Sequence, residues 1–472
     1  MKRYLCVLLA ALALCAPSFA EKRFEKDLGD GVKYIQVLRE DPNRIINVLK
    51  VDLASKNVEM KSVLSQDRIR TDKVYGRETV PMLVDKYGAL AGVNACFFDM
   101  SWWSDPLGAQ IVDGELVSQP SPFMPIAFTD HNTAFFDRPE FRGTLVNQTT
   151  GKTLDFSYVD GDIGYDGREN IIGVFNYRMG GSTCTEGDCT EMTLLCKQPA
   201  FSLAHPSYGI VTDVSENTCD SPVADDNIVI SASGTRAAEL KAFAKKGDVI
   251  KVVFEFISPS GRDWTKIKTA IDGSPHKILT AGQRLFDSEN IKEEGMFYVA
   301  HPRTALGISK DCKTLIIMVV DGRQKISTGA PYDLLGDLLL EFGAWDAVNF
   351  DGGGSSTMCL EGSIVNSPSD RYTRYISNAL LIMGKPTPVK VKGDPVIQGL
   401  PDGTLSPGEY QLSLSDKSIP NSQIIWGLRG SVGFVDQGGL FKVINSGKGT
   451  VTAHVGGRRF AKEIEVVIED NE

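Results

Sequence analysis

Two short apolar runs that each end in Asp-Gly constrain the fold of this chain more than any other feature. The runs Leu315–Val320 and Ala344–Phe350 are followed by Asp-Gly pairs that begin at Asp321 and Asp351. Short apolar runs that are bounded by Gly and Asp are typical of buried strands. We therefore expect two strands that each carry an aspartate to the edge of a sheet.

The segment between these runs predicts a helix. Pro331 suits a first helical turn and Gly343 suits the C-terminal exit. One face is apolar and consists of Leu334, Leu335, Leu338, Leu339 and Phe342. Two strands joined by a crossover helix normally run parallel, which would bring both aspartates to one sheet edge, where α/β folds bind ligands. An antiparallel return strand would instead separate them.

A glycine-rich loop follows the second aspartate. It reads Gly352, Gly353, Gly354, Ser355, Ser356 and Thr357. Consecutive glycines let the backbone turn its amides inward as a nest for an anion or a sugar. The loop is not a P-loop, because no Gly-Lys-Ser/Thr follows it. The alternative is a tight turn between strands, but the carboxylate before the loop and the hydroxyls after it favour a functional site.

The N-terminus has the pattern of a secretion signal. Two basic residues precede an apolar run from Tyr4 to Cys15, and a small-x-small cleavage site ends at Ala20. We expect a signal peptide over residues 1–20, cleavage after Ala20 and a secreted or periplasmic protein. Leu14 is too large for the usual lipobox, which argues against a lipoprotein anchored at Cys15. No later segment approaches the roughly 20 apolar residues of a membrane span.

The composition is acidic and its charges are dispersed. The formal net charge is −10, and the loss of Lys2 and Arg3 on cleavage would make it −12. This balance argues against a partner that is nucleic acid or an anionic membrane. An anionic substrate would therefore need basic groups placed locally at its site.

Four cysteines gather in one polar stretch. They are Cys184, Cys189, Cys196 and Cys219. In an oxidising compartment they predict up to two disulfides that staple loops. A zinc site is the alternative, although the stretch has no C-x-x-C pair and only His205 lies nearby.

The pattern along the chain predicts an α/β catalytic domain and a small all-β module. The catalytic domain takes residues 21–384, has a mixed sheet with helices, and contains a β-rich insertion at 143–262 where no chemistry is evident. An extended linker at 385–393 leads to 394–472, whose short alternating strands resemble an Ig-like sandwich with Trp426 in its core.

Several motifs together resemble the phosphodiester glycosidase family. They are NACFFD at Asn94–Asp99, PRTALG at Pro302–Gly307, VDGR at Val320–Arg323, NFDGGGSSTM at Asn349–Met358 and NSPSD at Asn366–Asp370. The resemblance covers about residues 33–384 and is thin across the insertion. It implies an exported hydrolase that cleaves the bond between a sugar and a phosphodiester.

The resemblance also implies a set of site residues. The catalytic candidates are Asp351, Asp321 and Arg303; the substrate-binding candidates are Asn94, Gly352, Gly353, Ser355, Ser356, Asp370 and Arg374. We interpret Asp351 and Asp321 as an acid/base pair, with Arg303 and the glycine amides holding phosphate oxygens. A structural salt bridge is the alternative for Arg303. We expect no cofactor, and the many aspartates leave a divalent metal such as calcium open.

Departures from the family pattern keep other functions open. Ala95 and Cys96 stand where the family commonly has two glycines, and Leu334 stands where a carboxylate is common. One alternative is a phosphodiesterase that cleaves phosphorus–oxygen bonds. The other is a glycan-binding surface protein without catalysis, which could hold cell-surface polysaccharide through its C-terminal domain.

Overall fold

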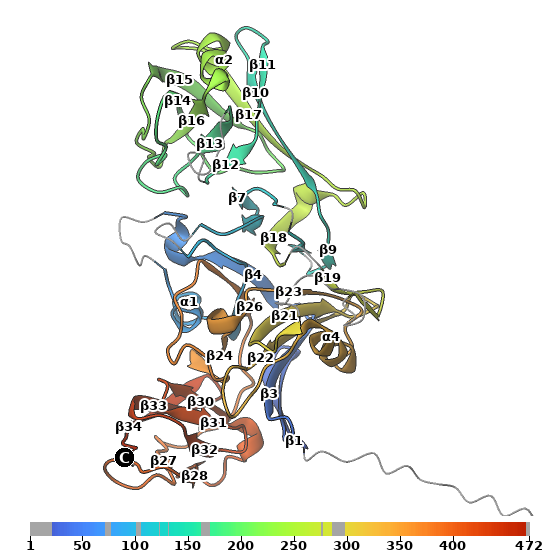
Figure 1. Cartoon of the computed structure of the whole chain (residues 1–472), viewed down its shortest axis with the longest axis vertical. Coiled ribbons are helices and arrows are strands. Elements are labelled where there is room, and N and C mark those ends of the chain that lie inside the picture. Colours follow the sequence, from blue (N-terminus) through green and yellow to red (C-terminus); the bar gives the residue numbers. More distant parts are fainter. Residues whose placement is uncertain are drawn as a thin grey trace, which may run out of the picture.

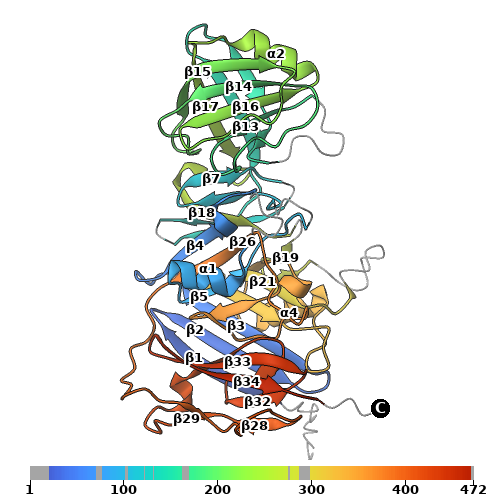
Figure 2. The ribbon, with the colours of Figure 1, turned by 90° about the vertical axis from the view of Figure 1, so that its left-hand side faces the viewer.

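A computed structural model describes the chain over residues 21–70, 77–100, 105–121, 123–130, 132–161, 170–274, 277–285 and 298–468. The expected signal peptide lies outside these ranges. The described residues form three tiers along the long axis of the molecule (Figure 1). The segment 140–257 is at one end, the C-terminal strands are at the other, and the central tier between them carries the predicted site (Figure 2).

The central sheet has eight strands in the order β1-β2-β3-β22-β21-β23-β19-β20, and all neighbours are antiparallel. Their bounds are β1 Glu21–Gly29, β2 Val32–Arg39, β3 Arg44–Asp52, β22 Thr314–Val320, β21 Arg303–Ile308, β23 Asp346–Asn349, β19 Lys277–Thr280 and β20 Gln283–Arg284. The interior strands are rich in β-branched residues and are buried on both faces, as in β22.

The predicted crossover helix is present as α4 (Tyr332–Glu341), between β22 and β23. Leu335, Leu338 and Leu339 are buried in the core that α4 shares with the central sheet. Because β22 and β23 both pair antiparallel with β21, which lies between them, they run parallel to each other. The expected parallel pair is therefore confirmed, with one additional strand inside it.

The predicted α/β fold is nevertheless wrong, because the described residues are mostly β. Besides α4, their α-helices are α1 (Val80–Tyr87) and α2 (Thr235–Phe243). Continuous apolar runs are typical of strands buried on both faces, whichever way the neighbouring strands run. In the central sheet one face packs on α4, and the other packs on a second sheet rather than on helices.

Two five-stranded sheets complete the central tier. One has the order β25-β24-β5-β26-β4, with β25 Ser363–Ile364, β24 Met358–Leu360, β5 Ala91–Asn94, β26 Asn378–Met383 and β4 Glu59–Leu64. The other has the order β7-β6-β18-β8-β9, with β7 Glu115–Ser118, β6 Gln110–Val112, β18 Ile267–Asp272, β8 Pro125–Thr129 and β9 Ala134–Phe136. The first supplies Val93, Met358 and Leu380 to the core against the central sheet.

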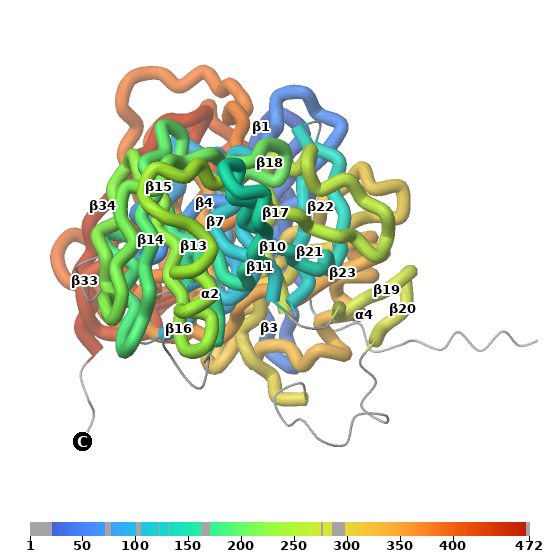
Figure 3. The backbone as a smooth tube through the Cα atoms, turned by 90° about the horizontal axis from the view of Figure 1, so that it is seen from above, coloured from blue at the N-terminus to red at the C-terminus, as the bar shows by residue number. Residues whose placement is uncertain are grey.

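The inserted segment forms its own eight-stranded sheet over the central tier, as the view from above shows (Figure 3). Its order is β11-β10-β17-β15-β14-β16-β13-β12, with β11 Thr153–Phe156, β10 Glu140–Asn147, β17 Val249–Ile257, β15 Ser207–Glu216, β14 Cys189–Leu195, β16 Asn227–Ser233, β13 Ile172–Phe175 and β12 Tyr158–Val159. The disulfide prediction is confirmed for one pair, Cys189–Cys219, whereas Cys184 and Cys196 are free.

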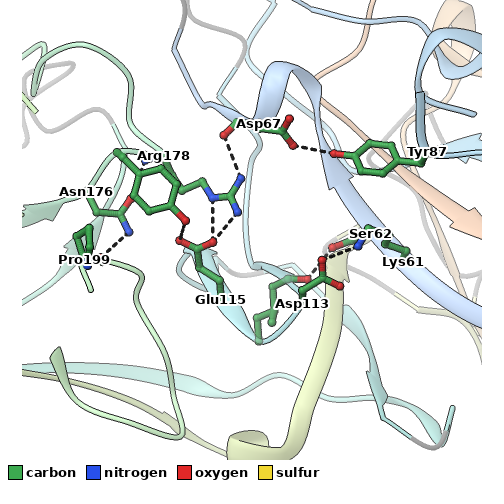
Figure 4. Close-up of polar contacts among 11 residues, drawn as sticks. Lys61, Ser62, Asp67, Tyr87, Asp113, Glu115, Asn176, Arg178 and Pro199 are labelled. Atoms are coloured by element: carbon green, nitrogen blue, oxygen red, sulfur yellow. Dashed lines mark hydrogen bonds and ion pairs between the residues drawn. The ribbon is translucent and has the colours of Figure 1, made fainter. Parts of the chain in front are cut away.

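Charged and polar side chains join the insertion to the central tier (Figure 4). The Arg178 guanidinium donates to Glu115 Oε2 on β7 and to the carbonyl oxygen of Asp67, at 2.5 and 3.1 Å. The Tyr87 hydroxyl, from the end of α1, donates to the Asp67 carboxylate at 2.7 Å. This chain of contacts fixes the insertion to two elements of the central tier.

The C-terminal tier consists of three small sheets around Trp426 and Phe441. The strands are β27 Ile397–Gln398, β28 Glu409–Gln411, β29 Ser413–Leu414, β30 Ile425–Arg429, β31 Gly433–Val435, β32 Leu440–Val443, β33 Gly447–Val455 and β34 Arg458–Val466.

Buried polar contacts attach the C-terminal tier to the central tier. The Gln437 amide donates to Gln36 Oε1 at 2.8 Å, and Ser363 Oγ lies 2.6 Å from Thr452 Oγ1 and 2.7 Å from His454 Nε2. This tier is therefore docked on the predicted catalytic region. Its assignment as an Ig-like module stays a prediction.

Candidate active site

Three chain segments meet at one edge of the central sheet. Asp321 directly follows β22, Arg303 is the first residue of β21, and Asp351 is the second residue after the end of β23. The register pairs Arg303 with Val320 and Ala305 with Asn349, which aligns the end of β22, the start of β21 and the end of β23. The expectation that both aspartates emerge at the same edge is confirmed.

Asp351 is partly exposed at this edge and its backbone is held on both sides. Its amide donates to the Ala95 carbonyl at 2.9 Å, and its carbonyl accepts from Asn94 Nδ2 at 2.7 Å. Burial raises the pKa of the Asp351 carboxyl to about 6, although a Ser355 hydrogen bond and the Arg374 charge oppose the increase. A carboxyl with a pKa near neutrality can exchange a proton with substrate or water.

Asn94 lies at the end of β5, and its side chain joins three segments of the site. Besides the bond to Asp351, its Oδ1 accepts from Thr304 Oγ1 at 2.8 Å and from the Thr357 amide at 3.1 Å. The residue is 1% exposed. In this arrangement Asn94 positions the loop that carries Asp351.

The glycine-rich loop is tight because other groups of the site approach its backbone. Gly353 has a φ of +62°, and a Cβ there would lie 3.1 Å from Arg323 Nη1. A Cβ on Gly354 would lie 2.0 Å from Asp370 Oδ2, so a side chain there would require the Asp370 carboxylate to move. The Gly353 amide donates to the Pro302 carbonyl at 2.9 Å, so the loop is also bonded to the segment before Arg303.

Asp370 and Arg374 form an ion pair beside this loop. Arg374 Nη2 lies 2.6 Å from Asp370 Oδ2, and Arg374 Nη1 donates to Ser355 Oγ at 3.2 Å. The loop after β25 thereby contacts the loop that carries Asp351. Ser356 is buried beside them, and its Oγ has no hydrogen-bond partner among the described residues.

Asp321 is buried, whereas Asp351 is partly exposed. It is 1% exposed, and its two oxygens accept from Asn366 Nδ2 and from the Ser367 amide, each at 2.8 Å. Burial raises the pKa of Asp321 to about 7, and those two hydrogen bonds limit the increase. These two hydrogen bonds fix the loop after β25.

Arg303 is buried between backbone carbonyls and an aromatic ring. Its Nε donates to the Ala330 carbonyl at 3.0 Å, its Nη2 donates to the Val299 carbonyl at 3.1 Å, and its guanidinium carbon lies 4.4 Å from the centre of the Tyr332 ring. Burial lowers the pKa of Arg303. The group places positive charge between the two aspartate-bearing strands.

Arg323 is a member of the site that the sequence prediction did not include. Arg323 Nε donates to His301 Nδ1 at 3.2 Å, and the guanidinium reaches Gly353. Burial, together with the charges of Arg323 and Arg303, lowers the pKa of His301. Arg323 has a φ of +60°, rare for a residue with a side chain. The sequence feature that could have indicated Arg323 is its position in the VDGR motif, two residues after Asp321.

No group of three or more His, Cys, Asp or Glu side chains is arranged to hold a metal within the described ranges. Of the four cysteines in the zinc alternative, Cys189 and Cys219 are joined in a disulfide. None of the helices in those ranges has the length and hydropathy of a membrane span.

Comparison with known proteins agrees with the motifs. Residues 205–383 match a family model, and this stretch contains Arg303, Asp321, Asp351 and Arg374. The match is to the phosphodiester glycosidase family. The resemblance predicted from the motifs is thus confirmed for this stretch, which does not include Asn94.

Individual relatives are distant or cover little of the chain. The SPbeta prophage-derived uncharacterized protein YomE of Bacillus subtilis (strain 168) is 40% identical over 84 residues, 18% of this chain and 13% of that protein. A hypothetical protein from Synechocystis has a TM-score of 0.60 at 16% identity, covering 75% of this chain and 62% of its own. A Burkholderia pseudomallei K96243 protein described as exported has a TM-score of 0.63 at 17% identity. The match covers 81% of this chain and 100% of that protein's chain. These two structures share the fold.

Proposed function

We propose that this chain is an exported glycosidase that hydrolyses the sugar–phosphate bond of a glycosyl-1-phosphodiester. The observation that best supports this function is the Asp351 carboxyl, which is partly exposed, has a pKa raised to about 6 and lies beside guanidinium groups at a sheet edge. The match of residues 205–383 to the phosphodiester glycosidase family supports the same reaction. The disulfide Cys189–Cys219 and the likeness to a protein described as exported support secretion.

In this proposal Asp351 acts as the general base. It accepts a proton from a water molecule as the water oxygen attacks the anomeric carbon. The bond from that carbon to the phosphate oxygen breaks, and its electron pair leaves with the phosphate. A phosphate is a fair leaving group, so stabilising its charge matters more than protonating it.

The positive groups would stabilise that leaving charge. Arg323 is exposed beside Gly353, and Arg303 contributes positive potential from below the surface. Asp321 is bonded to Asn366 and Ser367, so its proposed contribution is to position their loop. Ser355, Ser356 and the Asp370–Arg374 pair would border the sugar. The reaction as written requires no cofactor.

The proposal is tested with glycosyl-1-phosphodiesters in oxygen-18 water. Label in the released sugar supports carbon–oxygen cleavage, whereas label in the phosphate favours the phosphodiesterase alternative. Asp351→Asn should lower kcat about 10²- to 10⁴-fold while circular dichroism stays unchanged. A folded Asp351→Asn protein with undiminished turnover would refute the role of this carboxyl, whereas a wild type that hydrolyses no diester would favour a protein that only binds glycans.

A further inference from the structure

A polar cavity lies between the central and C-terminal tiers, next to the candidate active site. Its volume is about 450 Å³, within the range of sites for small ligands. One wall is formed by residues 323–326, 366–369 and 371–373, and the other by the C-terminal segments that contain Ser431 and Asn445.

The cavity shares groups with the active site. Arg323, which reaches Gly353, is part of its lining, and so are Asn366 and Ser367, which hold the Asp321 carboxylate. A ligand that extends from the Asp351 edge past Arg323 would therefore enter this cavity.

The charges of the lining are all positive. Arg323, Lys325 and Arg371 border the cavity, and no aspartate or glutamate does so among the described residues. Within the described ranges none of these three cations has a carboxylate partner. A chain with a net charge of −10 thus concentrates unpaired positive charge at one place, which favours an anionic ligand.

The rest of the lining suits a sugar. Ile364, Leu428 and Ile444 supply apolar surface, while Ser431 and Asn445 supply polar groups. Ser369 Oγ is buried and has no hydrogen-bond partner among the described residues, although buried hydroxyls normally have one. Arg371 has a φ of +63°, and such backbone strain gathers at ligand sites.

We propose that this cavity is a subsite for a phosphate-bearing sugar on the far side of the cleaved bond. The preferred substrate is then a chain of sugar phosphates rather than a simple glycosyl phosphodiester. The C-terminal tier takes part by forming one wall. This inference rests on the proposed function, because it names the substrate class of the same active site.

The test compares two substrates with the same scissile bond. One is the methyl diester of a hexose-1-phosphate, and in the other a hexose phosphate replaces the methyl group. The wild type should prefer the second by kcat/KM. Arg371→Gln and Lys325→Gln should each lower that preference about tenfold, the loss expected for one charge-assisted hydrogen bond. Arg68→Gln, at an exposed arginine outside the cavity, is the matched control.

Ser431→Trp provides a third cavity variant, which narrows the cavity from the C-terminal wall. It should lower the same preference while the melting temperature stays that of the wild type. Equal kcat/KM for both substrates in the wild type, or an equal preference in Arg371→Gln and Arg68→Gln, would overturn the subsite.

Direct binding separates the failure of the subsite from failure of the proposed function. If neither diester is hydrolysed, the proposed function fails and titration calorimetry with the two-unit hexose phosphate still decides the subsite. Weaker binding by about tenfold in Arg371→Gln than in Arg68→Gln supports it, whereas equal affinity refutes it.

Discussion

The pKa of Asp351 should respond in opposite directions to substitutions at the two members of the neighbouring ion pair. Its value is about 6 against an ordinary value of 3.8, a difference of about 2 pH units, or about 3 kcal/mol in favour of the protonated form. Burial is the main cause. The Arg374 charge lowers the pKa and the Asp370 charge raises it.

Arg374→Gln removes the charge that lowers the pKa of Asp351, and Asp370→Asn removes the charge that raises it. An opposite charge within about 4–6 Å lowers the pKa of a carboxyl by about 1–3 pH units. Because Arg374 shares its charge with Asp370, we take the smaller figure. A base is active when deprotonated, so activity is lost as pH falls through the pKa. The inflection should lie near pH 7 in Arg374→Gln and near pH 5 in Asp370→Asn, about one pH unit from the wild type in each case.

The assay is kcat/KM for release of sugar from a glycosyl-1-phosphodiester between pH 4.5 and 9. The position of the inflection is read separately from the height of the profile, because either variant could also weaken substrate binding. Circular dichroism at the two pH limits provides the folding control. Inflections that move in the same direction in both variants, or that stay near pH 6, would refute the assignment of this titration to Asp351.

Three further predictions concern stability and loop geometry. Replacing Cys189 and Cys219 by alanine should destabilise the inserted segment by about 3–4 kcal/mol in urea denaturation, from the loop entropy of a bridge with a separation of 30 residues; an unchanged midpoint would contradict this. Gly354→Ala should displace the Asp370 carboxylate and lower kcat/KM at least tenfold, since the added Cβ would lie 2.0 Å from Oδ2; full activity would refute the crowding. Asp321 has a folded-state pKa raised to about 7, so its stabilising effect is present at low pH and is lost as pH rises through 7. The free energy of unfolding of the wild type should therefore rise by about 3 kcal/mol relative to that of Asp321→Asn when the pH is lowered from 8 to 5. Equal pH dependences of the two unfolding free energies would rule this out.

Local patterns predicted the elements around the site well. The helix before Gly343, the strands before the two aspartates and their common sheet edge all depend on short-range periodicity and on the direction of a crossover. The sequence could not show that β21 lies between β22 and β23, because β23 pairs with residues 305–308 across the intervening β22 and α4. The same limit explains the wrong fold class. A buried apolar strand has the same composition whether a helix or another sheet covers it.

The site residues were predicted less completely than the strands. Asp351 lies in the NFDGGGSSTM motif and Arg374 lies four residues after NSPSD, and the structure brings the two residues together through Ser355. Arg323 was overlooked because its positive φ and its approach to Gly353 depend on folded geometry. The enclosure of Asp321 could not be predicted either, since its hydrogen-bond partners come from a loop 45 and 46 residues later.

Because β21 lies between β22 and β23, the arrangement of the active site depends on the pairing of these strands as much as on its loops. Strands in a sheet are about 4.8 Å apart, so two steps place the end of β22 and the end of β23, which lead to the two acids, roughly 10 Å apart. Loops can therefore change to suit another sugar without altering this spacing. Deleting one residue within β21 would instead turn alternate side chains to the opposite face and remove Arg303 from between the acids.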